Sequence, residues 1–186
     1  MQPDTTSQLS PTTIALHWIV GVGVIGMLTL GIYMAETETW ALYPWHKSFG
    51  VLIFFVILLR VIWRMKSGWP APVERFHSAE LLLIRTVQFT LLAGTLLMPL
   101  SGFLMSALGG SGVAVFGLEI VPFNPDPDNP AMPQAHHGPL ASFFHTMHTW
   151  VAWILVIALV LHVAGALKHH LLDRDGTLRR MLGARV

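Results

Sequence analysis

Four histidines stand inside the longest apolar stretches of this chain of 186 residues: His17, His46, His148 and His162. A metal-ligating or ionisable side chain inside a membrane span is costly, and it is a functional candidate by default. Neutral imidazole is the commonest metal ligand that a protein provides. These residue types therefore suggest metal or haem-iron ligation, provided that the chain brings the imidazoles together in pairs.

The spacing within the last apolar stretch favours two separate sites. His148 and His162 are fourteen residues apart. On an α-helix this spacing puts both on one face, to within roughly 40°, and about 21 Å apart along the axis. His145 also stands at the start of this stretch, but it lies roughly 100° away from the face of His162. We therefore prefer His148 to His145.

The elements that hold these histidines are predicted to be membrane helices. About 20 mostly apolar residues cross the hydrocarbon of a bilayer. Four segments qualify, at about 14–34, 44–63, 81–108 and 142–167. The chain has 11% charged residues, against about 25% in a soluble domain. We expect an all-α integral membrane four-helix bundle that forms a single membrane domain over residues 1–186. Segment 109–141, rich in Gly, Pro and Asp, is expected to be an irregular outer loop facing solvent.

The basic residues predict the orientation. Lys47 alone falls on one side of the predicted bundle, and ten basic residues fall on the other: Arg60, Arg64, Lys66, Arg75, Arg85, Lys168, Arg174, Arg179, Arg180 and Arg185. Because cytoplasmic loops collect Lys and Arg, we expect cytoplasmic N- and C-termini. The net charge of +1 gives no indication of nucleic-acid binding.

This topology pairs the histidines by depth. His17 and His162 are expected near the cytoplasmic surface, whereas His46 and His148 are expected near the outer one. Two buried imidazole pairs, one per leaflet, suit bis-histidine ligation of two haem irons in the core of a bundle. A small residue one turn after each histidine would leave room for a porphyrin: Gly21, Gly50, Ala152 and Ala166, with Gly165 beside the last.

Other polar and aromatic residues have simpler interpretations. Arg60, at the depth of the cytoplasmic pair, could bind a haem propionate, as could Arg85; a snorkelling anchor is the equal alternative for Arg60. The remaining histidine pairs are expected to be solvated rather than metal-binding: His136 with His137, and His169 with His170. Tryptophans at the segment ends are typical of an interfacial aromatic belt: Trp18, Trp40, Trp45, Trp63 and Trp69.

Several motifs resemble one known family. They are Leu16-His17-Trp18, His46-Lys47-Ser48-Phe49-Gly50, Leu59-Arg60-Val61 to Arg64, Leu161-His162 through Ala166-Leu167-Lys168-His169-His170, and the tail from Asp173 to Met181. In this order they are similar to the bacterial cytochrome b561 family, small dihaem cytochromes of the inner membrane. The resemblance implies two haem b groups (protohaem IX) and axial ligands at the four histidines above. It also implies quinone as a substrate, a homodimer, and a role in respiratory electron transport.

The expected function is therefore transmembrane electron transfer between a quinone pool and an outer-side donor or acceptor, without an acid–base catalytic residue. One alternative is a superoxide oxidase that reduces quinone, although the expected outer side holds five acidic residues against Lys47. Others are a cytochrome b anchor subunit of a dehydrogenase or hydrogenase, and a histidine-lined metal transporter. The transporter is disfavoured because no buried carboxylates line a path. The outer loop is the expected site of partner recognition.

Overall fold

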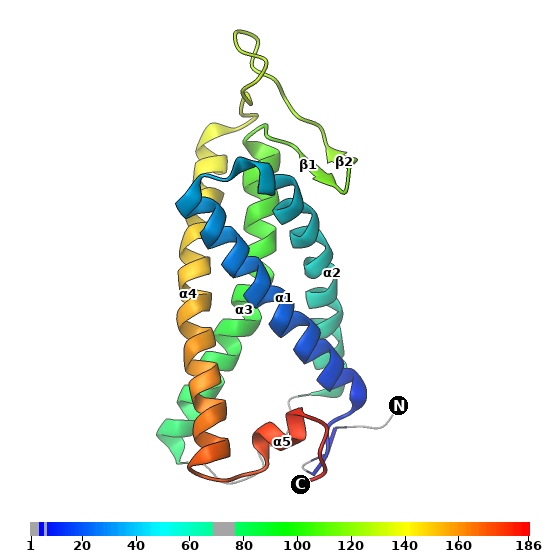
Figure 1. Ribbon diagram of the computed structural model, residues 1–186, viewed down its shortest axis with the longest axis vertical. Coiled ribbons are helices and arrows are strands. Elements are labelled where there is room, and N and C mark those ends of the chain that lie inside the picture. The colour runs from blue at the N-terminus through cyan, green and yellow to red at the C-terminus, as the bar shows by residue number, and fades with distance from the viewer. Residues whose placement is uncertain (1–3, 6, 69–76) are drawn as a thin grey trace.

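The computed structural model describes residues 4–5, 7–68 and 77–186, so Trp69 and Arg75 lie outside the described residues. Four long helices stand side by side (Figure 1): α1 (Pro11–Thr37), α2 (Tyr43–Ser67), α3 (Ser78–Leu108) and α4 (Gly138–Leu171). A 3₁₀ turn, η1 (Trp40–Leu42), joins α1 to α2, and a short helix, α5 (Thr177–Met181), follows α4. Each long helix is apolar and long enough to cross a membrane. The predicted all-α membrane bundle is confirmed.

The helices extend beyond the apolar runs that predict them, and polar side chains cap the first turns of α1 and α4. The hydroxyl of Ser10 accepts a hydrogen bond of 3.2 Å from the amide of Thr13 and so begins α1, as expected for an N-cap serine. The imidazole of His137 accepts one of 3.2 Å from the amide of Leu140 and begins α4. Helix α4 therefore starts four residues earlier than the apolar pattern predicts.

The segment between α3 and α4 is not wholly irregular, and here the prediction is wrong. Strands β1 (Val113–Val115) and β2 (Leu118–Val121) form an antiparallel hairpin. The two residues between them, Phe116 and Gly117, have φ of 48° and 88°. Such a two-residue turn with positive φ matches the twist of a hairpin, and the flanking β-branched and apolar residues favour strands.

The core lies at mid-height in the bundle. Helix α1 packs against α2, α3 packs against α4, and α2 also packs against α3. A cluster of Leu28, Val151 and Leu155 joins α1 to α4, and Leu155 is seven residues from both His148 and His162. This apolar layer therefore separates the two levels at which the histidines lie.

The two ends of the bundle differ. Both termini lie at one end (Figure 1), where the amide of Val186 donates a hydrogen bond of 2.9 Å to the carbonyl of Ser7. We call this the terminal end. The hairpin and the rest of segment 109–137 cover the opposite end, which we call the loop end.

Candidate functional site

At the terminal end, His17 of α1 and His162 of α4 face each other. Their ring centroids are 6.1 Å apart, and their planes are tilted by 54°. The Nη2 atom of Arg60 lies 3.3 Å from His17 Nδ1. Because a guanidinium only donates hydrogen bonds, Nδ1 is the acceptor in this contact. A Cβ added at Gly21 or Gly165 would meet no atom within 4 Å, so the predicted space beside this pair is present.

At the loop end, His46 of α2 and His148 of α4 form a second pair. Their ring centroids are 6.4 Å apart, and the planes are inclined at 80°. His148 Nδ1 lies 2.9 Å from the carbonyl oxygen of Met98. A carbonyl only accepts, so Nδ1 carries the proton and Nε2 keeps its lone pair for a metal.

Ser101, which is 0% exposed, completes this arrangement on α3. Its hydroxyl donates a hydrogen bond of 2.9 Å to the carbonyl of Met98. Its oxygen lies 3.1 Å from His148 Nδ1 and accepts there. The His148 ring is therefore fixed in both orientation and tautomer by α3, a contact that the sequence does not reveal.

Glycines on facing segments make room for the loop-end imidazoles. A Cβ at Gly31 would lie 3.1 Å from His46 Cε1, and one at Gly102 would lie 2.9 Å from His148 Cε1. The small residues predicted to make room, one turn after each histidine, do not include these two glycines. The available signal was weak: a glycine inside a helical pattern often has a packing reason.

The loop-end pair borders an apolar cavity and has an unsatisfied polar atom. The cavity is lined by His46, His148 and Val113 together with apolar side chains of α1, α2 and α3. Among the described residues, the buried His46 Nδ1 has no hydrogen-bond partner. Buried polar side-chain atoms nearly always have a partner, so this atom indicates a group that completes the site.

The separations within the pairs suit metal ligation. Imidazole nitrogen–metal bonds are about 2.0–2.1 Å long, so two imidazoles on opposite sides of one ion have ring centres about 6 Å apart. The two observed separations, 6.1 and 6.4 Å, agree with this value. Each pair could therefore hold one metal centre with little movement of the helices.

Several other candidates lie outside the pairs. His145 is exposed on α4, which supports the preference for His148, and Arg85 is exposed on α3. His136 and His137 are exposed in the loop, and the ring of His137 caps α4. None of these four side chains forms a ring contact or a hydrogen bond with His17, His46, His148 or His162 in the described part of the chain.

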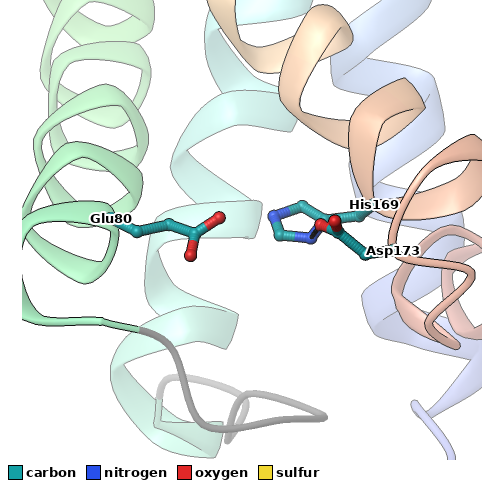
Figure 2. Close-up of side chains that lie close together, drawn as sticks. All are labelled: Glu80, His169 and Asp173. Atoms are coloured by element: carbon teal, nitrogen blue, oxygen red, sulfur yellow. Dashed lines mark ion pairs between the residues drawn. The ribbon is translucent and has the colours of Figure 1, made fainter.

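The expectation that His169 is solvated is wrong. It is 7% exposed, and its Nδ1 lies 3.0 Å from Asp173 Oδ2 and 3.1 Å from Asp175 Oδ2. Seven residues separate it from His162, so the helical repeat returns it to the inner face of α4. Figure 2 shows Glu80 of α3 opposite His169 and Asp173.

A cation is already present in this cluster. Lys168 Nζ lies 2.8 Å from Glu80 Oε1 and 2.7 Å from Asp173 Oδ2. Its hydrogen bond holds the pKa of Asp173 below the usual value. Because the ammonium group occupies the position between these carboxylates, the cluster is an ion-pair network that joins α3 to α4.

A second polar network ties the N-terminal segment to the terminal end. Thr13, 2% exposed, donates a hydrogen bond of 2.9 Å to Asp4 and accepts one of 2.8 Å from the indole of Trp63. The indole of Trp18 donates one of 2.9 Å to the carbonyl of Met181. These tryptophans therefore have specific structural partners besides their place in the aromatic belt.

A membrane-spanning four-helix bundle with two histidine pairs at opposite ends defines a class of protein, the membrane cytochromes that hold cofactors between helices. A family model described as prokaryotic cytochrome b561 matches residues 8–184. The chain belongs to this family, whose members transfer electrons through b-type haem in the bacterial inner membrane.

Three relatives agree with this assignment. Cytochrome b561 homolog 2 of Escherichia coli (strain K12) is 33% identical over 97% of this chain and 94% of its own length. Cytochrome b561 homolog 1 of the same organism is 24% identical over 96% and 99%. A probable superoxide oxidase CybB of Yersinia pestis is 24% identical over 91% and 92%.

The described residues fit a b-type haem. The loop-end pair offers one imidazole whose Nδ1–H is already hydrogen-bonded to a carbonyl, the usual arrangement of a metal-ligating histidine. It also offers a second imidazole with an unsatisfied buried nitrogen and an adjacent apolar cavity. The chain has no cysteine, so the haem is held without thioether bonds.

Proposed function

We propose that this chain binds two b-type haems, one between His17 and His162 and one between His46 and His148. Electrons would pass between them, linking a quinone pool to a redox partner on the outer side. The observation that supports this most directly is the presence of two imidazole pairs at opposite ends of one bundle. The apolar layer around Leu155 lies between them.

The haem supplies one-electron chemistry, and the chain supplies ligands, orientation and a medium of low polarity. His148 enters the site with its tautomer fixed, because Met98 and Ser101 accept its Nδ1 proton. If His17 binds iron through Nε2, its Nδ1 carries the proton and no longer accepts from Arg60. The guanidinium would then turn to another acceptor, and a haem propionate is a suitable one.

The terminal end is the proposed cytoplasmic side. Among the described residues, the basic side chains of this end come from the second half of α2, the start of α3, the last turn of α4 and the tail that follows: Arg60, Arg64, Lys66, Arg85, Lys168, Arg174, Arg179, Arg180 and Arg185. Lys47 is at the loop end, where its ammonium group donates a hydrogen bond of 2.8 Å to the carbonyl of Gly112. This distribution follows the positive-inside rule. Assembly as a homodimer, which the family resemblance implies, is part of the same proposal.

Quinone reactivity tests the proposal directly. Protein in lipid nanodiscs would be reduced with dithionite, freed of excess reductant without oxygen, and mixed with a short-chain ubiquinone in a stopped-flow spectrometer. We expect reoxidation of both haems at a rate that rises with quinone concentration. Haems that stay reduced in the presence of quinone, but react with an added outer-side partner, would contradict the quinone link.

Superoxide is a second candidate donor, because one relative is named a probable superoxide oxidase. The electrostatics of the loop end argue against fast capture of an anion. This end has one lysine, Lys47, and five acidic residues: Glu36, Glu38, Glu119, Asp126 and Asp128. An acidic surface repels an anion rather than steering it inward. We expect slow haem reduction by superoxide, with no acceleration at low salt; a fast, salt-sensitive rate would contradict this expectation.

A further inference from the structure

The hairpin at the loop end rests on the lipid-facing side of α2. Large apolar side chains on α2 recur every three or four residues and are exposed: Trp45, Phe49, Leu52, Phe55 and Leu59. On a helix, this spacing forms one stripe. Because the bundle spans a membrane, we expect an exposed apolar stripe of this kind to face lipid.

Phe116, at the turn of the hairpin, packs on this stripe. Its ring centroid lies 5.4 Å from that of Phe49 and 6.1 Å from that of Trp45. Phe49 is six residues into α2, so it lies about 9 Å along the axis from the start of the helix. Figure 1 shows the hairpin beside the first turns of α2. The turn therefore lies beside the second turn of α2 rather than beyond the end of the helix.

Hydrogen bonds from α2 fix the hairpin in this position. The buried hydroxyl of Ser48 accepts a bond of 3.0 Å from the amide of Phe116 and donates one of 2.7 Å to the carbonyl of Pro44. Lys47 Nζ donates to the carbonyl of Gly112 at 2.8 Å. The tip and the base of the hairpin are thus both held against the helix, so the placement of Phe116 does not depend on apolar packing alone.

One face of the hairpin is apolar and exposed. Phe116 is 52% exposed, Leu118 68% and Ile120 51%. Leu118 and Ile120 share one face of β2, because side chains alternate along a strand, and Glu119 lies on the other face. The apolar face continues the lipid-facing stripe of α2, and aromatic side chains such as Phe116 and Trp45 are typical of a membrane interface.

We propose that the hairpin Val113–Val121 is a membrane-interface element whose apolar side, formed by Phe116, Leu118 and Ile120, inserts into the lipid leaflet at the loop end. The unpaired backbone edge of a two-stranded sheet is not tolerated in hydrocarbon, so the hairpin lies at the boundary between headgroups and acyl chains. At the other end of the element, Val113 is 2% exposed and lines the cavity that holds His46 and His148. The same hairpin would therefore contact lipid through Phe116, Leu118 and Ile120 and close the cavity through Val113.

The natural absence of cysteine makes the test simple. Leu118→Cys, at a side chain that is 68% exposed, would be spin-labelled in the complete protein reconstituted in phosphatidylcholine–phosphatidylglycerol vesicles. Accessibility of the label to oxygen and to a water-soluble nickel chelate reports its environment. Leu52→Cys is the lipid-facing reference, and the exposed Asp128→Cys is the aqueous one. Phe116→Cys repeats the measurement at the turn, and Glu119→Cys samples the opposite face of the same strand.

We expect the labels at 118 and 116 to have an oxygen-to-nickel accessibility ratio several-fold above that at 128 and below that at 52, because Leu52 lies deeper along α2 than the hairpin. The label at 119 should be more accessible to nickel than its neighbour at 118. Nickel access at 118 equal to that at 128 would overturn the proposal by placing the hairpin in water. Shielding of 118 from both reagents would also overturn it, because it would show contact with protein, such as a second copy of this chain.

Discussion

Gly102→Ala is expected to weaken haem binding at the loop end alone. The added methyl group would lie 2.9 Å from His148 Cε1 and 3.2 Å from its Nδ1, which is closer than ordinary van der Waals contact. The imidazole cannot easily turn away, because Nδ1 is hydrogen-bonded to Met98 and Ser101. Overpacking of this kind costs about 1–3 kcal/mol, which corresponds to roughly 5- to 150-fold weaker binding.

The assay is titration of haem-depleted protein with haem, followed by the optical spectrum. Gly26→Ala is the matched control, because a Cβ there meets no atom within 4 Å. Alanine in place of a helical glycine stabilises by about 0.5–1 kcal/mol, so the control should retain both haems. Equal loss of both haems in Gly102→Ala, or unchanged affinity at both sites, would refute the reasoning about the His148 ring.

Two further substitutions address the polar contacts. Ser101→Ala removes one acceptor from the His148 Nδ1 proton, which makes the imidazole a less basic ligand. The lost hydrogen bond is worth about 0.5–1.5 kcal/mol. For a one-electron couple, this predicts a rise of roughly 20–60 mV in the midpoint potential of the haem that His148 binds. Redox titration should show the potential of the other haem unchanged. A fall in the potential, or an equal shift of both potentials, would contradict the assignment of His148 to one haem. Thr13→Val leaves Asp4 and the Trp63 indole short of a partner, at a cost of about 1–3 kcal/mol. Its thermal midpoint of haem loss should fall with the haem stoichiometry unchanged, and an unchanged midpoint would show that this network is not stabilising.

The sequence predicts the four spans and the meeting of the histidines because both follow from regular helices. The fourteen-residue spacing of His148 and His162 fixes their common face. His17 and His46 each lie near the start of a helix, and because α1 and α2 run in opposite directions, the two residues lie at opposite ends of the bundle. These inferences need only helix geometry and span order.

The contacts between helices could not be predicted in the same way. Whether Ser101 or Gly102 meets His148 depends on the rotation and depth of α3 relative to α4, which no pattern along the chain fixes. The hairpin was hidden because its strands are only three and four residues long and lie in a segment rich in Gly and Pro. The burial of His169 could have been predicted from its seven-residue spacing from His162. Its two aspartate partners could not, because they come from the irregular turn after α4.

The most direct test of the central claim is haem quantitation with reduced-minus-oxidised spectra for the wild type and four alanine variants. These variants are His17→Ala, His46→Ala, His148→Ala and His162→Ala. We predict two b-type haems per chain in the wild type and loss of one haem in each variant. The same haem should be lost in His17→Ala and His162→Ala, and the other in His46→Ala and His148→Ala. A wild type with one haem, or losses that group in any other way, would contradict the paired sites.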